Sequence, residues 1–219
     1  MKKYFICFLL ALGMIPCLSG AELLLEITPD GKTQTTKFQQ TASKGIQTTE
    51  KGLAFAGNAS VINFNTPKPN KNFMNSFTFV SEVTFNAFAP AKKQSVIVFR
   101  PGYNNVLAVD FNGYAIAACW YTDREGKKKQ LRIWSKRKLK LNRTYLIASV
   151  TESRPDGTIH CKLLVDGLIE AEKTVTGELY PYPHKLSVGN SNKNDSGVNG
   201  TLHNLKIYNG TLTVEEIVK

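Results

Sequence analysis

The sequence predicts an all-β protein, a two-sheet antiparallel sandwich of the jelly-roll type with a short C-terminal helical turn. Apolar and polar residues alternate with period two through most of the chain, and helical periodicity is nearly absent. Turn-forming pairs such as Asn112-Gly113, Asp156-Gly157 and Asp166-Gly167 recur at short intervals, as tight hairpins require. With 42% hydrophobic residues among 219 and no Pro/Ser-rich linker, the chain suits one domain with a sizeable core.

Residues 1–21 are predicted to be a secretory signal peptide, which leaves residues 22–219 as the domain. Two lysines precede an apolar run from Tyr4 to Ile15, and small residues then offer a cleavage site. The run is short for a membrane span, so we expect no transmembrane segment in the mature chain. We expect a secreted or periplasmic protein, bacterial to judge by its short signal. Cys17 leaves lipid anchoring open as an alternative to soluble export.

The strands are expected in the following order. Three short strands come first: Leu23–Thr28, Leu53–Ala56 and Val61–Phe64. A polar stretch from Asp30 to Glu50 lies between the first and the second of them. Phe77–Phe85 alternates large apolar residues with polar ones and predicts a strand with one buried face. A meander of strands follows: Ser95–Arg100, Asn105–Phe111, Tyr114–Thr122, Gln130–Ser135, Thr144–Thr151, Thr158–Val165, Leu168–Val175, Lys185–Val188 and Thr201–Tyr208. Thr213–Val218 is expected to form the helical turn, because its early glutamates suit the helix dipole.

Several of these segments carry a recognisable order of residues: Leu53-Ala54-Phe55-Ala56-Gly57, Phe77-Thr78-Phe79, Leu164-Val165-Asp166-Gly167 and Leu186-Ser187-Val188-Gly189. This order resembles the laminin G-like, concanavalin A-type jelly-roll family. The ending adds to the resemblance, because Gly200–Tyr208 followed by Leu212–Ile217 is similar to the family's closing strand and its Leu-Ser-x-Glu-Glu-Ile tail. The resemblance covers most of the mature chain and implies the same two-sheet fold.

The closing strand departs from the family pattern. Relatives usually carry an Asp-Glu pair where this chain has His203 and Asn204, which leaves no acid there for a structural or metal contact. His203 alternates with apolar residues of the same strand, so it is predicted to point toward the core. Trp120 alternates with Ile116 and is also predicted to lie in the core.

No motif predicts a reaction, and we expect a protein without enzymatic activity. Glycosidases on this fold need two carboxylates close together on one strand face, which positions i and i+2 share. The signature Glu-x-Asp-x-x-Glu is absent, and outside the turn at 123–126 only Glu170 and Glu172 form such a pair, on an apparently exposed hairpin strand. The histidines stand in no nucleophile motif, and no Gly-rich phosphate loop is found. A glycan-processing enzyme with an unrecognised site is the third hypothesis.

The most unusual local feature is the basic segment 123–143, whose ten Lys and Arg against two acids give a local charge of +8. Within it Arg132, Trp134 and Lys136 alternate with apolar residues, which predicts them on a solvent-facing side. An aromatic ring between cations suits a polyanionic glycan or cell-surface polymer. The alternative is a solvated hairpin whose basic side chains cover the ring by cation–π contact. Nucleic acid is not expected as the ligand of an exported jelly roll.

A second candidate site is the Pro-rich loop that begins at Tyr180. It contains Tyr180 and Tyr182, and Asn190 and Asn192 follow shortly after. Exposed aromatic rings pack on the C–H face of a sugar while amides bond its hydroxyls, so these four residues suit a neutral sugar. The alternative is a rigid turn followed by a solvated polar loop.

The sequence does not decide whether the chain contains a disulfide or binds a metal ion. Cys119 and Cys161 remain after signal removal, and they suit either one disulfide or buried free thiols. Calcium is common in the family that the chain resembles, where carboxylates and carbonyls bind it. Asp110 and Asp195 are available, but no clustered acidic loop is visible, so neither calcium nor another cofactor is predicted.

These observations together predict an exported, lectin-like module that binds carbohydrate without catalysis. The alternative, from a different class, is a protein-interaction or structural domain of a cell-envelope assembly, using a sheet face or the basic hairpin. A fold by itself does not choose between them, because many functions share one fold.

Overall fold

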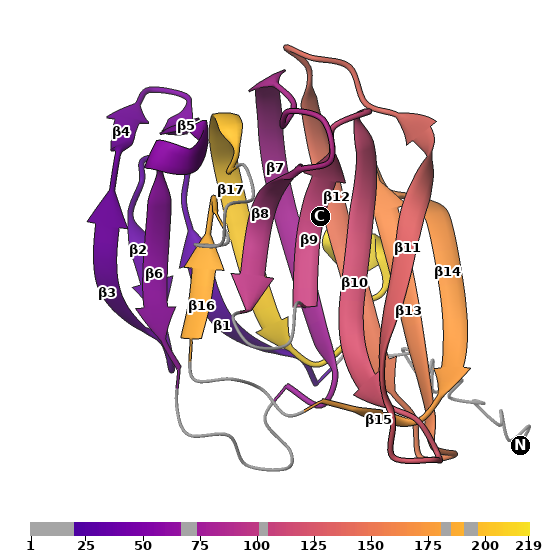
Figure 1. The fold of residues 1–219 in the computed structure, drawn as a ribbon. Coiled ribbons are helices and arrows are strands. Elements are labelled where there is room, and N and C mark those ends of the chain that lie inside the picture. The colour runs from indigo at the N-terminus through magenta and orange to yellow at the C-terminus, as the bar shows by residue number, and fades with distance from the viewer. Residues whose placement is uncertain (1–19, 67–73, 101–104, 181–184, 191–196) are drawn as a thin grey trace, which may run out of the picture.

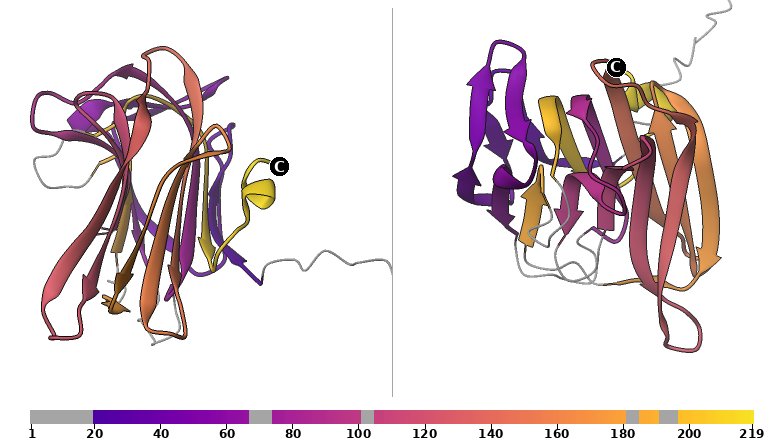
Figure 2. Two further views of the ribbon diagram at one scale, coloured as in Figure 1. Left: turned by 90° about the vertical axis from the view of Figure 1, so that its right-hand side faces the viewer. Right: turned by 45° about the horizontal axis from the view of Figure 1, so that its top comes forward.

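The protein, described here by a computed structural model, folds into two antiparallel sheets that lie face to face (Figures 1 and 2). The structure describes residues 20–66, 74–100, 105–180, 185–190 and 197–219. The predicted fold class, an antiparallel jelly-roll sandwich with a short helical turn near its end, is confirmed. The signal peptide predicted for residues 1–21 lies almost wholly outside the described residues.

Sheet A has nine strands within the described ranges. In spatial order they are β14 (Leu168–Thr176), β13 (Thr158–Val165), β12 (Thr144–Ser153), β7 (Phe77–Ala87), β17 (Asn199–Asn209), β1 (Glu22–Ile27) and β2 (Thr33–Thr35), with β5 (Gly52–Ala56) paired to β17 and β4 (Ile46–Thr49) paired to β5. The last strand of the chain therefore lies in the middle of this sheet, between β7 on one side and β1 and β5 on the other.

Sheet B has eight strands in the same part of the chain. In spatial order they are β11 (Lys128–Lys138), β10 (Tyr114–Thr122), β9 (Asn105–Asp110), β8 (Gln94–Arg100), β16 (Lys185–Val188), β6 (Val61–Asn65) and β3 (Gln39–Lys44), with β15 (Glu178–Leu179) paired to β10. The edge strand β11 contacts β14, the edge strand of sheet A, so one side of the sandwich is closed by these two strands.

The core lies between the sheets and is built by alternation. Phe77, Phe79 and Phe85 of β7 point inward and are fully buried, as the pattern of this strand predicts. Cys119 and Cys161 belong to the same core and are free thiols, which decides the open question of a disulfide between them. Burial of large apolar side chains, at about 25 cal/mol per Å² of apolar surface, is what holds the two sheets together.

Most predicted strands are confirmed to within a few residues. Tyr114–Thr122, Thr158–Val165 and Lys185–Val188 coincide with β10, β13 and β16. The main omission is the polar stretch between Asp30 and Glu50, which contains β2, β3 and β4. Their side chains are almost all exposed, so no apolar alternation marks these strands in the sequence.

The helical turn is also confirmed. The helix α1 (Val214–Ile217) begins with a capping box: the Thr213 hydroxyl accepts from Glu216 N at 3.3 Å, and the Glu216 carboxylate accepts from Thr213 N at 2.8 Å. Ile217 packs against Val80 and Leu164 on the outer face of sheet A, which fixes α1 there (Figure 2).

The prediction that His203 points toward the core is wrong. A β-bulge between Leu202 and Asn204 adds a residue to β17 opposite β7, which breaks the alternation. Leu202 and Leu205 are therefore both buried, and His203 turns away from the core, where its Nε2 lies 2.8 Å from Thr84 Oγ1.

Candidate ligand-binding face

The edge strand β11 presents the predicted residues of the basic segment to solvent. Leu131 and Ile133 face the core and are buried, whereas Trp134 between the charged positions is 47% exposed. Arg132 and Lys136 lie two residues before and after Trp134, so they share its face. The prediction for these three residues is confirmed at the level of orientation.

Trp120 lies on the same outer face, and the prediction that it belongs to the core is wrong. Cys119 and Tyr121 occupy the core side of β10, which leaves Trp120 between them on the outer side. In the hairpin of β10 and β11, Trp120 stands opposite Gln130, and Ile116 stands opposite Trp134. The sequence contains information that places Trp120 correctly. The turn at 123–127 and the outward position of Trp134 together fix which side of β10 faces solvent.

Tyr180 joins this face from a distant part of the chain. The strand β15 pairs with the end of β10, and Tyr180 N donates to the Trp120 carbonyl at 3.0 Å. The Lys128 ammonium lies 4.2 Å from the centre of the Tyr180 ring. Tyr180, one residue of the second predicted site, therefore lies on the same surface as the basic segment. We call this surface the β10–β11 face and define it by Trp120, Lys128, Gln130, Arg132, Trp134, Lys136 and Tyr180.

The aromatic rings of the β10–β11 face are in contact with cations. The Arg132 guanidinium carbon lies 5.8 Å from the centre of the Trp134 ring, a cation–π contact of the kind that the solvated-hairpin alternative expects. Trp134 nevertheless keeps about half of its surface in solvent. Gln130, on the same face, has a buried Nε2 that donates to no described residue. The face therefore offers a ring, cations and an amide donor within one surface.

Part of the positive charge of the basic segment is neutralised by ion pairs with acidic side chains. Lys129 pairs with Asp123 at 2.6 Å, Arg143 pairs with Asp166 at 3.0 Å, and Arg137 pairs with Glu170. The hydrogen bond from Lys129 holds the pKa of Asp123 below its ordinary range, so this pair stays charged at neutral pH. Lys136 has no acidic partner among the described residues. The electrostatic character of the face therefore rests on cations that point outward from β11.

Of the remaining predicted site residues, the structure describes Asn190, which does not lie on this face. Asn190 is 7% exposed, and its amide donates to the Asn58 carbonyl at 2.9 Å, so it holds two loops together. Tyr182 and Asn192 lie outside the described residues. We leave Asn190 out of the candidate site.

Glu170 and Glu172, the pair of acids that the sequence places two residues apart on one strand, differ in their surroundings. The expectation that Glu170 is exposed beside Glu172 is wrong, because a β-bulge opposite Leu163 and Leu164 inserts Glu170 as an extra residue. Glu170 is buried and turns toward β11, whereas Glu172 is exposed and lies near His160 at 3.2 Å. The two therefore do not share a face.

A metal centre is not seen in the described ranges, where no three His, Cys, Asp or Glu side chains cluster. The Asp110 carboxylate, a calcium candidate, accepts from Asn112 N and Tyr114 N at 2.9 Å each, which stabilises the turn after β9. Asp195, the other candidate, lies outside the described residues. No helix in the described part of the chain has the length and hydrophobicity to cross a bilayer.

The fold is that of a concanavalin A-like β-sandwich, and comparison with known families agrees. A laminin G family model, described as the concanavalin A-like lectin/glucanases superfamily, matches residues 56–218. The chain therefore belongs to this superfamily, which confirms the resemblance seen in the sequence. No match was found among curated proteins.

Several solved structures share the fold. The receptor binding domain of botulinum neurotoxin type G superposes with a TM-score of 0.60 at 10% identity, covering 90% of this chain and 50% of that one. A Trypanosoma rangeli sialidase in complex with sialic acid gives 0.60 at 17% identity, covering 89% of this chain and 32% of that one. The binding domain of botulinum neurotoxin DC in complex with SialylT gives 0.59 at 10% identity, covering 90% and 50%. The chain spans half or less of these proteins, and at such identities the similarity shows the fold.

Proposed function

We propose that the protein is an exported, non-catalytic module that binds an acidic carbohydrate on the β10–β11 face. The observation that carries this proposal is Trp134, which is 47% exposed and stands between Arg132 and Lys136 on one strand face. An indole ring that is exposed between two cations combines an apolar face for stacking with charged groups for polar contacts.

The geometry suits a sugar ring with anionic substituents. Positions two residues apart on a strand are separated by about 7 Å, so a sugar stacked on Trp134 places its substituents within reach of both flanking cations. The indole packs on the C–H face of the ring, and the guanidinium of Arg132 pairs with a carboxylate or sulfate. Gln130 and Tyr180 supply further polar groups, which lie farther along the β10–β11 face toward Lys128.

Two further observations support the proposal. Solved relatives of this fold are described as complexes with sialic acid or SialylT, and sialic acid carries a carboxylate. The absence of catalysis is supported by Glu170, whose carboxylate is committed to Arg137 and backbone N–H groups and is therefore a poor nucleophile or general acid.

The deciding experiment is a glycan array probed with the purified chain at low and high salt. Wild-type protein should retain acidic glycans at low salt and lose them at high salt. Trp134→Ala should abolish retention, and the matched control Phe111→Ala should not, because Phe111 is a 41% exposed aromatic on the turn after β9. An array without retained glycans, or equal retention by both variants, would refute the proposal.

A protein-interaction role is the second candidate. A specific observation favours it: the outer face of sheet A, opposite the β10–β11 face, carries an open groove beside α1 that is lined by both apolar and charged side chains. This groove is a separate surface, and the two functions do not exclude each other.

A further inference from the structure

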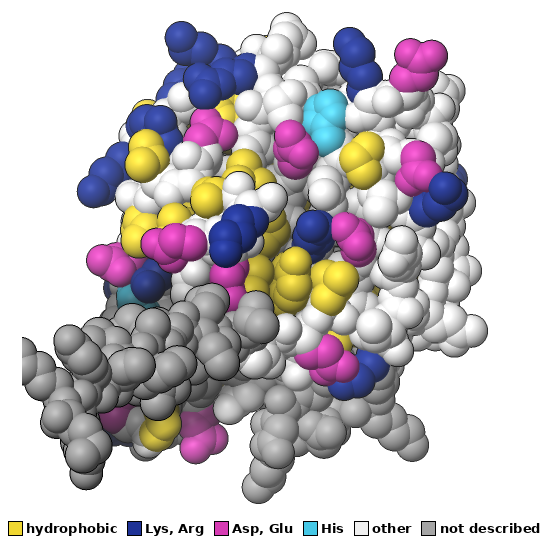
Figure 3. Space-filling view, turned by 180° about the vertical axis from the view of Figure 1, so that it is seen from behind, with side chains coloured by type: hydrophobic (Ala, Val, Ile, Leu, Met, Phe, Trp, Pro, Cys, Tyr) yellow, Lys and Arg dark blue, Asp and Glu magenta, His cyan; other side chains and the backbone are white. Residues whose placement is uncertain are grey.

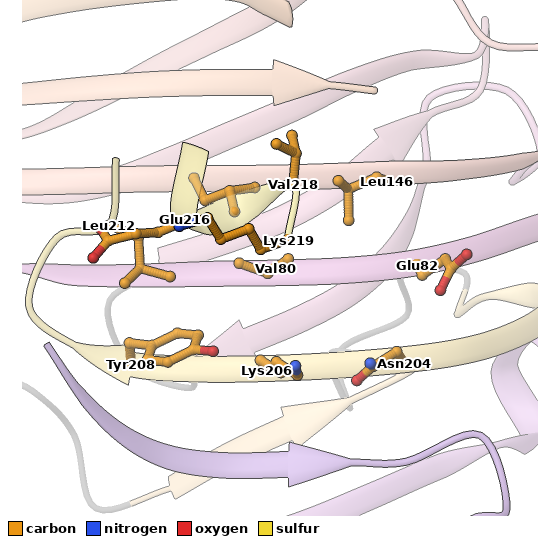
Figure 4. Close-up of a pocket in the computed structure, with 11 residues that line it drawn as sticks. Val80, Glu82, Leu146, Asn204, Lys206, Tyr208, Leu212, Glu216, Val218 and Lys219 are labelled. Atoms are coloured by element: carbon orange, nitrogen blue, oxygen red, sulfur yellow. The ribbon is translucent and has the colours of Figure 1, made fainter. Parts of the chain in front are cut away.

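The outer face of sheet A carries an apolar patch surrounded by charged side chains (Figure 3). α1 covers part of this patch by packing Ile217 on Val80, Ala148 and Leu164. Between α1 and β17 a groove stays open, with a cavity volume of about 280 Å³ (Figure 4). We call it the α1 groove and name it by six of its lining residues: Val80, Glu82, Leu146, Asn204, Tyr208 and Val218.

One end of the groove offers hydrogen-bond acceptors. Glu82 of β7 and Asn204 of β17 stand directly opposite each other in the sheet. The bulge at His203 is what turns Asn204 to this face. Asn204 Oδ1 is buried and accepts from no described residue, and the exposed Glu82 carboxylate has no cationic partner among them. A buried acceptor without a donor is costly, so a ligand that donates here is favoured.

The charges around this end favour a cationic donor. Lys206, which also lines the groove, has its ammonium 3.5 Å from Glu26, so its charge is compensated within the protein. Lys219 is the other cation of the lining. The acceptor end itself carries the Glu82 carboxylate, which has no cationic partner among the described residues and therefore favours a cationic donor.

The other end is apolar and open. Val80 is buried at its floor and Val218 on the rim is 52% exposed, whereas the half-buried Leu146 stands opposite Glu82 and borders the acceptor end. The volume of about 280 Å³ is at the lower limit of pockets that enclose whole small molecules, about 300 Å³. The groove is better matched to a few side chains that project from a larger partner.

We propose that the α1 groove binds a basic, aliphatic peptide segment of a partner protein. A lysine of the segment donates to the Glu82 carboxylate and to Asn204 Oδ1, and a neighbouring aliphatic side chain packs on Val80, Leu146 and Val218. The groove lies on the sheet opposite to the β10–β11 face, so the two proposed sites do not overlap.

The test uses a pentapeptide that carries fluorescein on its N-terminus, fluorescein-Leu-Val-Lys-Leu-Val-amide, and its counterpart with Glu in place of Lys, each titrated with the full chain in fluorescence anisotropy. The basic peptide should bind, and the acidic one should not. Glu82→Gln should weaken binding about tenfold, the value of one hydrogen bond to a charged group. The matched control Glu172→Gln, an exposed acid on another strand of sheet A, should leave binding unchanged.

Val218→Ser is a second variant that keeps the fold intact, since Val218 is exposed, and it should weaken binding severalfold. Trp134→Ala should bind the peptide as wild type does, which separates this proposal from the glycan site. The proposal fails if the basic peptide does not bind at millimolar protein, if both peptides bind equally, or if Glu172→Gln weakens binding as much as Glu82→Gln.

Discussion

Glu170 of β14 and Arg137 of β11 form an ion pair that joins the edge of one sheet to the edge of the other. The Glu170 carboxylate also accepts from Lys136 N and Arg137 N at 3.0 Å each, and the Arg137 guanidinium donates to the Val165 carbonyl at 3.1 Å. This set of bonds closes the side of the sandwich on which Trp134 stands. It also fixes the backbone of β11 directly after the proposed binding residues.

Glu170→Gln should destabilise the protein by about 2 kcal/mol, because Glu170 is buried and accepts several bonds that a neutral amide replaces poorly. Urea unfolding followed by tryptophan fluorescence measures the change. The control Glu172→Gln, two residues away and exposed, should change stability by less than about 0.5 kcal/mol. Equal effects of the two variants would show that the ion pair does not hold the edge.

The same pair predicts a pH dependence. Burial raises the pKa of Glu170, but the N–H groups and guanidinium of Arg137 outweigh it, so the pKa lies below its ordinary value. Between the folded and unfolded pKa values the unfolded chain binds more protons, so stability rises with pH there. The difference in stability between wild type and Glu170→Gln should be constant above the ordinary glutamate pKa and shrink as pH falls below it. Unfolding midpoints over an acid pH series test this, and a difference independent of pH would contradict it.

Trp120→Ala distinguishes an outer-face residue from a core residue. A core aromatic replaced by alanine costs about 3–5 kcal/mol, and Phe79→Ala should show that loss. Trp120 is half-buried on the outer face, so its replacement should cost clearly less and should weaken glycan retention. Urea unfolding and the glycan array measure the two effects. A loss of stability as large as that of Phe79→Ala would show that Trp120 is packed as a core residue and would contradict its position on the outer face.

Lys136→Gln should weaken glycan binding severalfold at low salt, because it removes a cation beside Trp134. The effect should fade in 1 M salt, where screening acts over about 3 Å. Lys173→Gln, an exposed lysine on β14, removes the same charge from sheet A and should have little effect. Titration of the best array ligand at several salt concentrations compares the two variants. An equal loss of glycan affinity in both would show that binding depends on the net charge of the protein and not on a site at Trp134.

The two thiols should be unreactive in the folded protein. Burial raises the pKa of the Cys161 thiol to about 12, so almost no thiolate forms near neutral pH, and Cys119 is fully buried. An aromatic disulfide reagent at pH 8 should label neither cysteine until urea is added, and reducing agent should not shift the melting temperature. Rapid labelling of native protein would contradict the packing of this core.

The sequence predicts the candidate site in part. Alternation places Trp134 outward correctly, because β11 is regular and has apolar residues on its other side. The same rule fails at His203 and Glu170, where β-bulges add a residue that no local pattern marks. It also leaves Trp120 on the wrong side, because alternation gives the period of a strand, and pairing with a neighbour decides which side is buried.

The sequence by itself determines the fold class, most strand positions, the hairpin turns and the outward basic residues of β11. These depend on neighbours in the chain, on period-two alternation and on turn residues that tolerate positive φ. Only the tertiary structure brings Tyr180 beside Lys128, pairs Glu170 with Arg137, and leaves Asn204 without a donor in a groove. Such contacts join residues far apart in sequence, and they depend on strand order and bulges, which local patterns do not encode.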